Sequence, residues 1–160
     1  MSTLDSAPEY SVRRLTVADA DEVAELSGQL GYPASSGELR QRLEEISLTQ
    51  ERVAFAAELH GKLAGWIDAS IERHLQSPPC VVIGGLVVRD ELRGLGIGKR
   101  LCEEIEAWTR SKSIPCLRVR SQIVREAAHR FYLRDGYRIV KTSLVFEKTL
   151  TCADERHNAD

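Results

Sequence analysis

The chain has 160 residues, of which 42% are hydrophobic and 29% charged, so a single domain is expected over residues 1–150, with a flexible tail at 151–160. The net charge of -2 argues against a dedicated nucleic-acid-binding protein. The longest apolar run, residues 80–88, is too short to cross a bilayer, and residues 1–10 are polar and acidic, unlike a signal peptide. We therefore expect a cytoplasmic protein that contacts no membrane.

The first part of the chain predicts a strand followed by two helices. Residues 12–15 have the composition of a strand, and Thr16 is expected to cap the helix that follows. This helix has an apolar stripe at helical spacing and ends at Gly31. A second amphipathic helix is expected to start at Ser35 or Ser36.

The middle of the chain predicts strands. Residues 53–58 and 63–71 are joined by His60-Gly61, which indicates a hairpin. The segment 77–79, Ser-Pro-Pro, is expected to break the chain, and the apolar run 81–88 then forms a buried strand.

The last part predicts alternating elements. We expect a helix over 97–111, a strand over 117–121, a short helix over about 125–134 and a final strand over 137–147. The resulting order, β-α-α-β-β-β-α-β-α-β, predicts a mixed α/β sandwich and not a repeating βαβ array.

The four cysteines are widely spaced and include no C-x-x-C pair. This spacing favours small buried side chains in a reducing compartment over disulfides, and no metal site is expected. The four positions are Cys80, Cys102, Cys116 and Cys152.

The most informative segment is residues 82–98, with the sequence VIGGLVVRDELRGLGIG. It predicts a buried strand, a glycine-rich basic turn and the start of a helix. Glycines let a ligand approach the backbone closely, and the free N–H groups at a helix start favour an anion. The segment therefore predicts a site for a phosphorylated ligand.

Two nucleotide motifs fail in this segment on particular residues. A P-loop needs a glycine where Arg93 stands and a serine or threonine where Arg100 stands. A dinucleotide fingerprint needs a small residue where Lys99 stands, together with an acidic residue after the next strand. A third pattern, [RQ]-x-x-G-x-[GA], fits residues 93–98 completely.

A second block supports the third pattern. Residues 128–137, AHRFYLRDGY, match the pattern A-x-x-[FL]-Y-x-x-x-G-[FY], one strand and one helix after the glycine loop. With both blocks, the chain resembles the GCN5-related N-acetyltransferase (GNAT) family over residues 13–148. The residues from 80 to 137 carry nearly all of that resemblance.

The resemblance implies a fold and a co-substrate. The fold would be a mixed, mostly antiparallel central sheet flanked by helices, with a splayed cleft for acetyl-CoA. The backbone of the strand Leu86, Val87 and Val88 would pair with the pantetheine arm. The loop would hold the pyrophosphate through residues listed in chain order as Arg93, Gly94, Leu95, Gly96, Ile97, Gly98 and Lys99.

The reaction implied is attack of a neutral amine on a thioester. Tyr132 matches the tyrosine acid of the family, which would protonate the departing thiolate, although a packed aromatic is the simpler alternative. The backbone N–H of Val88 is the candidate donor to the oxyanion.

The general base and the acceptor are not defined by the resemblance. Asp68 or Glu72 on one face of a strand would suit a cationic amine, and a solvated strand edge explains them equally well. Glu58 and His74 are further candidates for the base. Arg125 stands where the family commonly has asparagine, so it either pairs with a CoA phosphate or faces solvent at a helix start.

Two other functions remain open at this stage. One is a non-catalytic acyl-CoA-binding or regulatory module with the same fold, and the other is a nucleotide-dependent enzyme. The family often forms homodimers, and an edge strand over 140–147 is the expected contact.

Overall fold

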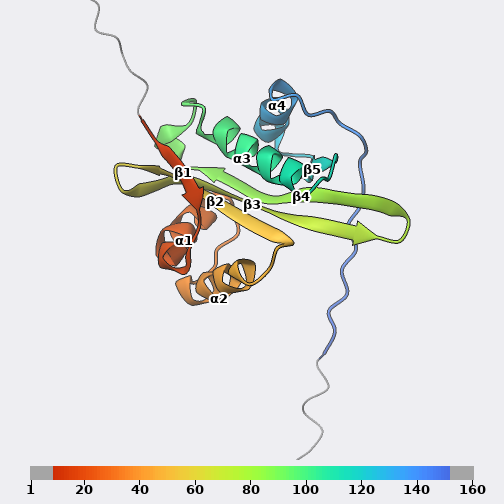
Figure 1. Ribbon diagram of the computed structural model, residues 1–160, viewed down its shortest axis with the longest axis horizontal. Helices are drawn as coiled ribbons and strands as arrows, with labels where there is room; N and C mark the ends of the chain where they lie inside the picture. Colours follow the sequence, from red (N-terminus) through yellow and green to blue (C-terminus); the bar gives the residue numbers. More distant parts are fainter. Residues whose placement is uncertain (1–8, 152–160) are drawn as a thin grey trace, which may run out of the picture. The chain divides into compact units, whose positions relative to one another are not determined.

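The computed structural model describes residues 9–151, and the chain divides into two compact units, one up to Val124 and one from Arg125 (Figure 1). No helix within the described residues is both long and apolar enough to cross a membrane.

The first unit is built on a five-stranded sheet in the order β1-β2-β3-β4-β5. All neighbours are antiparallel except β4 and β5, which are parallel, so the predicted mixed, mostly antiparallel sheet is confirmed. The strands are β1 Ser11–Arg14, β2 Arg52–Leu59, β3 Lys62–His74, β4 Ser77–Val88 and β5 Leu117–Val119. The helices of this unit are α1 Ala20–Gln29, α2 Ser36–Ser47 and α3 Ile97–Ser111, with short 3-10 turns η1 Val17–Asp19 and η2 Asp90–Leu92.

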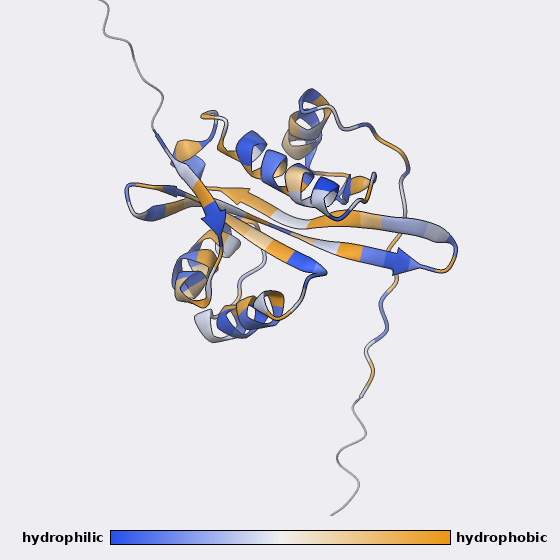
Figure 2. Cartoon of the chain, in the orientation of Figure 1, coloured by the Kyte–Doolittle hydropathy of each residue, from blue (hydrophilic) through white to orange (hydrophobic). Residues whose placement is uncertain are grey.

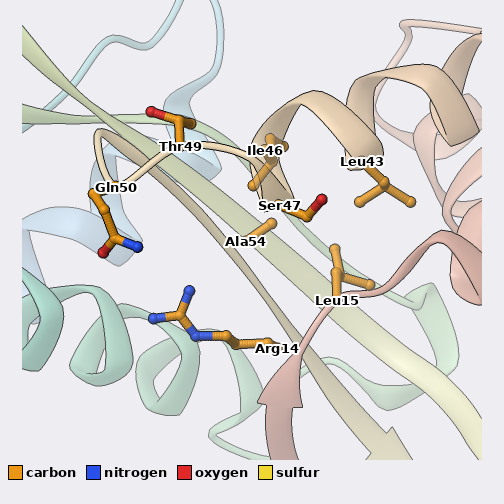
Figure 3. A pocket seen from close by; sticks show the side chains of 8 residues that line it. All are labelled: Arg14, Leu15, Leu43, Ile46, Ser47, Thr49, Gln50 and Ala54. Atoms are coloured by element: carbon orange, nitrogen blue, oxygen red, sulfur yellow. The ribbon is translucent and has the colours of Figure 1, made fainter.

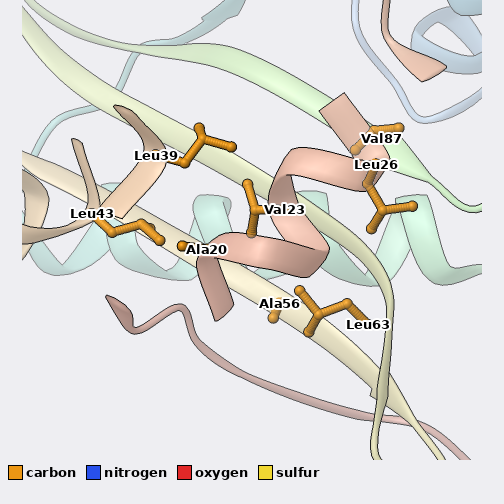
Figure 4. Close-up of a cluster of buried hydrophobic side chains, with 8 residues drawn as sticks. All are labelled: Ala20, Val23, Leu26, Leu39, Leu43, Ala56, Leu63 and Val87. Carbon is orange, nitrogen blue, oxygen red and sulfur yellow. The ribbon is translucent and has the colours of Figure 1, made fainter. Parts of the chain in front are cut away.

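Helices cover both faces of this sheet: α1 and α2 lie on one face and α3 on the other (Figure 1). Figure 2 shows apolar and polar residues alternating around these helices, which is the pattern of a helix with one buried side. On the face of α1 and α2, the core is formed by Ala20, Val23, Leu26, Leu39, Leu43, Ala56, Leu63 and Val87 (Figure 4).

Local sequence signals explain the first helices and the first hairpin. Ser35 caps α2, because its hydroxyl accepts a hydrogen bond from the backbone N–H of Glu38 and the Glu38 carboxylate accepts one from the backbone N–H of Ser35. His60 and Gly61, with φ of 51° and 76°, form the two-residue turn between β2 and β3. The predicted helix start and hairpin are therefore confirmed.

The expected break at residues 77–79 is wrong, because β4 already begins at Ser77 and runs through both prolines. Proline lacks a backbone N–H and is tolerated where a strand has a free edge. Strand β5 pairs with β4 only from Val81 onward, so the two prolines lie where β4 has no neighbour on that side.

The second unit contains α4, Glu126–Arg134, which confirms the predicted short helix. The predicted strand over 137–147 is wrong: residues 138–151 form no regular secondary structure. The apolar spacing of this segment is typical of a strand, but a strand also needs a neighbour to satisfy its backbone, and no sheet pairing includes these residues.

The expectation that all cysteines are free is also wrong. Cys80 near the start of β4 and Cys116 just before β5 form a disulfide, whereas Cys102 is buried in α3 and Cys152 lies outside the described residues. Residues far apart in the sequence come together here because β4 and β5 are neighbours, which spacing alone does not reveal.

Candidate active site

The glycine loop between β4 and α3 has the backbone that its sequence predicts. Gly94 and Gly96 have φ of 82° and 80°, a left-handed conformation that side chains rarely adopt. An added Cβ at either position would meet no atom within 4 Å, so the space over the loop is open. A ligand could therefore approach this backbone directly.

The start of α3 provides N–H groups toward the same loop. Gly96 is the N-cap residue and no side chain caps it. The first helical bond runs from Arg100 N to Gly96 O at 3.0 Å, so the N–H groups of residues 97–99 have no acceptor within the helix. Such donors, together with the helix dipole, attract an anionic group.

The basic side chains near the loop differ in their partners. Arg93 lies 2.8 Å from Asp90, and Arg100 lies 2.6 Å from Glu104 one turn along α3. Lys99 is exposed and has no carboxylate partner among residues 9–151. Lys99 is therefore the cation of this loop that is most readily available to a phosphate.

The end of β4 has an open edge. Strand β5 pairs with Val81, Val82 and Ile83 only, so residues 84–88 lack a β5 neighbour in the described structure. On the other side, Arg89 N donates to Ala64 O at 2.8 Å.

This bond fixes the direction of the backbone groups along the open edge. In an antiparallel ladder, hydrogen-bonded and non-hydrogen-bonded pairs alternate, and Ala64 with Arg89 is a hydrogen-bonded pair. The pairs Gly65–Val88 and Ile67–Leu86 are then non-hydrogen-bonded. The N–H groups of Leu86 and Val88 therefore point away from β3, toward the open edge.

A bulge in β4 lies at the far end of this edge. Asp68 pairs with Gly85 and Ala69 with Ile83, so Gly84 is an extra residue in β4. A Cβ on Gly84 would stand 2.9 Å from Asp68 Oδ2, and a Cβ on Gly85 would stand 3.4 Å from Asp68 Oδ1. The Asp68 carboxylate thus lies directly over Gly84 and beside Gly85, where the Trp66 ring is closer, 2.8 Å from the Cβ position.

Asp68 has the environment of a carboxylate that holds a proton more readily than usual. Burial raises its pKa, and this effect exceeds the opposing effects of the Arg52 charge and of a hydrogen bond from the Gly85 backbone. Asp68 faces the α1 and α2 side of the sheet, because it follows Trp66 at strand spacing and Trp66 packs against that core.

The other candidate bases are held in ion pairs or exposed. Glu72 accepts two hydrogen bonds from Arg120, at 2.8 and 2.7 Å, and these hold its pKa below its usual value. Glu58 accepts a hydrogen bond from Arg13 at 2.9 Å. His74 is exposed and lies 3.5 Å from Glu72. Asp68 is the candidate whose environment best suits proton transfer.

Sequence reasoning missed three residues around these features. Tyr10 donates from its hydroxyl to Gly96 O in the loop, at 3.3 Å. Gln122, after β5, donates to the hydroxyl of Tyr32 in the α1–α2 connection, also at 3.3 Å. Arg120 is the third, through its pair with Glu72. All these contacts join segments distant in sequence, so no local pattern announces them.

A pocket of about 190 Å³ lies elsewhere in the first unit, at the end of α2 (Figure 3). None of the predicted site residues lines it. Its walls are Arg14, Leu15, Leu43, Ile46, Ser47, Thr49, Gln50 and Ala54. Among the described residues, no group of three or more His, Cys, Asp or Glu side chains could hold a metal ion.

Tyr132 lies in α4 of the second unit. Its ring makes edge contacts with Phe131 and Tyr137, with ring centroids 5.1 and 5.3 Å apart. Gly136 has φ of 91°, so the turn after the helix requires glycine, as the family motif has it. Arg125 is the N-cap residue of α4, and its side chain makes no capping bond.

Comparisons with known proteins agree with the sequence motifs. The model of the acetyltransferase (GNAT) family matches residues 20–137. The aminoalkylphosphonate N-acetyltransferase of Salmonella typhimurium is 29% identical over 140 residues, covering 84% of this chain and 88% of that protein. An aminoglycoside N(6′)-acetyltransferase type 1 of Stenotrophomonas maltophilia is 26% identical over 151 residues, covering 91% and 95%.

Solved structures show the same fold. The aminoglycoside N-acetyltransferase AAC(6′)-Iy in complex with CoA superposes with a TM-score of 0.81 at 18% identity, covering 92% of this chain and 100% of that one. Glucosamine-6-phosphate N-acetyltransferase from Arabidopsis thaliana gives a TM-score of 0.70 at 23% identity, covering 89% and 99%. The chain therefore belongs to the acetyltransferase (GNAT) family, the enzymes that use acetyl-CoA to acetylate an amine.

Proposed function

We propose that the protein transfers the acetyl group of acetyl-CoA to a primary amine at the bulge of β4, where Asp68 receives the proton of the amine. The observation that carries the proposal is the open edge of β4, which runs from the glycine loop to the Asp68 carboxylate.

The glycine loop and the open edge would hold acetyl-CoA. The N–H groups of residues 97–99 and the Lys99 side chain suit the pyrophosphate. From Val88 to Gly84 the strand spans about 13 Å, enough for much of an extended pantetheine arm. The arm would lie along this edge and bring the thioester to the bulge.

Two backbone donors along the edge would then have different roles. The N–H of Val88 lies near the loop and suits an amide of the arm. Leu86 directly follows Gly85, which is the cross-strand partner of Asp68. The N–H of Leu86 therefore suits the oxygen of the thioester. We therefore assign the oxyanion to Leu86 in place of Val88, because the donor must lie beside the carbon that the amine attacks.

Asp68 would remove a proton from the attacking amine, since its raised pKa brings it closer to the operating range of a general base. A bond forms between the amine nitrogen and the acetyl carbon, and the bond from that carbon to sulfur breaks. Tyr132 would return a proton to the departing thiolate, a role that rests on the family motif of residues 128–137.

The proposal also covers the acceptor and the cellular location. The two curated relatives are named for an aminoalkylphosphonate and for aminoglycosides, both of which offer a primary amine. We place the protein in the cytoplasm, where acetyl-CoA is available.

A homodimer is also proposed, because large apolar side chains of the second unit are exposed and a second copy would cover them. They follow α4 in the sequence and are Ile139, Val140, Leu144, Val145, Phe146 and Leu150. Sedimentation of the full chain should give a dimer, and Phe146→Lys should shift it toward the monomer. A protein that is monomeric at all concentrations would contradict the proposed homodimer.

Ligand binding tests the co-substrate. CoA should raise the melting temperature, whereas ATP and NAD should not, and stabilisation by ATP or NAD alone would overturn the proposal. Incubation of acetyl-CoA with a panel of primary amines should then release free thiol. Binding of CoA with no thiol release from any amine would instead indicate the non-catalytic acyl-CoA-binding module.

A further inference from the structure

The side chains around Asp68 carry information about the acceptor. Asp68, Ser70 and Glu72 alternate along β3 and therefore share the face that α1 and α2 cover. Arg120 donates a hydrogen bond to Glu72 on this face. Cys116 forms the disulfide with Cys80, the cross-strand partner of Glu72, so Cys80 lies on the same face.

Arg118 lies on the same face. It pairs with Val82 of β4, and residues directly opposite each other in neighbouring strands point to the same face of the sheet. Its neighbour in β4 is Val82, and the neighbour of Val82 in β3 is Ser70. Arg118 on β5 is therefore level with Ser70 on β3, two residues along β3 from Asp68. Strand β4 lies between them.

The charges on this face are not all matched. Arg120 is bound to Glu72, and Arg52 lies 3.9 Å from Glu45. Arg118 is exposed, and its guanidinium has no carboxylate partner among residues 9–151. Asp68 has no side chain bound to its carboxylate in the same part of the chain, apart from the long-range influence of Arg52. Among these charged groups, Asp68 and Arg118 are the two that no charged side chain binds in the described residues.

Two contacts connect the segment after β5 with other parts of the first unit. The bonds from Arg120 to Glu72 and from Gln122 to Tyr32 tie the segment after β5 to β3 and to the α1–α2 connection. From strand spacings, the Cα atoms of Asp68 and Arg118 are roughly 12 Å apart, and both residues lie on the same face of the sheet.

We propose that the acceptor is a small primary amine that also bears an anionic group, a phosphonate, phosphate or carboxylate. Its ammonium would lie at Asp68 and its anion at Arg118. This inference rests on the proposed function, in which the amine meets the thioester at Asp68. A polycation would bring further positive charge against Arg118 and gain no partner there.

Matched acceptors test the inference. We compare 3-aminopropylphosphonate and 4-aminobutanoate with 3-aminopropanol, which is neutral apart from its amine, and with spermidine, following thiol release from acetyl-CoA. At least one of the anionic amines should have kcat/KM about tenfold or more above those of 3-aminopropanol and spermidine, as expected for a charge-assisted hydrogen bond. The order of the phosphonate and the carboxylate identifies the anion.

Variants of the full chain locate the effect. Arg118→Gln should raise KM for the anionic amine about tenfold and leave KM for 3-aminopropanol unchanged, and Arg118→Lys should restore part of the affinity. Arg110→Gln on α3, at the opposite face of the sheet, serves as the matched control and should change neither.

Two results would overturn the inference while leaving the proposed function in place. One is that spermidine or 3-aminopropanol is acetylated as well as the anionic amines. The other is that Arg118→Gln alters KM equally for all acceptors. Failure of the proposed function looks different, because no amine would then release thiol.

Discussion

The carboxylate of Asp68 occupies the space that a side chain at residue 84 would need: a Cβ on Gly84 would stand 2.9 Å from Asp68 Oδ2 and 3.1 Å from Oδ1. The bulge that inserts Gly84 into β4 puts these groups against each other. Gly84 and Asp68 therefore form one structural unit, and a substitution of either residue should shift the other.

Gly84→Ala should displace the Asp68 carboxylate from the bulge. We expect kcat to fall about tenfold or more and stability to fall by about 1–3 kcal/mol, the usual cost of forcing extra atoms into a packed region. The affinity for CoA should change little, because the glycine loop is untouched. Steady-state kinetics, CoA titration and thermal unfolding measure the three effects.

Gly28→Ala in α1 is the matched control, since an added Cβ there meets nothing within 4 Å. It should retain full activity and be equally or more stable, because alanine favours a helix over glycine. Normal kcat in Gly84→Ala would show that the position of the Asp68 carboxylate does not matter for the reaction.

Asp68 should also make stability depend on pH. Burial raises its pKa above the ordinary aspartate value, so between these two values the folded protein binds more protons than the unfolded chain. Stability contributed by this group therefore falls as pH rises through that window, because the folded state must hold a desolvated negative charge.

Asp68→Asn removes this charge and should be inactive yet more stable than the parent at neutral pH. Melting temperatures of the two proteins should converge as the pH falls toward the ordinary aspartate pKa. Asp21→Asn, an exposed change in α1, should show no such convergence. An Asp68→Asn protein that is less stable than the parent at neutral pH would mean that the carboxylate stabilises the fold.

Much of the fold follows from local signals in the chain. The capping serine at Ser35, the His60-Gly61 turn and the apolar spacing in α3 each specify a short stretch, and each prediction is confirmed. The glycine-rich turn between a strand and a helix is likewise predicted from residues 82–98, and the structure adds that Gly94 and Gly96 are left-handed.

Other features depend on partners that no local pattern names. The segment 138–151 has strand-like spacing without a neighbouring strand, so the expected strand is absent. The choice between Asp68 and Glu72 depends on Arg120, which follows a different strand. The sequence placed both acids on one face, and only the tertiary contacts separate their chemistry.

Tyr132→Phe tests the acid assigned from the family motif. Removing the hydroxyl leaves the ring, which contacts Phe131 and Tyr137, so the fold should be retained. We expect kcat to fall by about 10²-fold or more, within the range of a lost general acid, with little change in CoA affinity. The loss should be smaller for acyl donors whose thiol is more acidic, because such a thiolate leaves without a proton. Unchanged turnover would remove the assignment.

The Cys80–Cys116 disulfide should stabilise the sheet between β4 and β5. It closes a loop with a sequence separation of 36 residues, for which the entropy lost by the unfolded chain corresponds to about 3–4 kcal/mol. A reducing agent should therefore lower the melting temperature of the parent and leave that of Cys116→Ala unchanged. Alkylation should label Cys80 and Cys116 in the unfolded parent only after reduction.

Cys102→Ala is the control for this experiment, because Cys102 is a buried residue of α3 outside the Cys80–Cys116 disulfide. It should lower stability by the loss of packing, by the same amount with and without the reducing agent. Cys80 precedes Gly84 by four residues, about 13 Å along the strand, so the reduced parent should still acetylate its amine at temperatures below its melting point. Labelling of both cysteines without reduction would show that the bond does not form in solution.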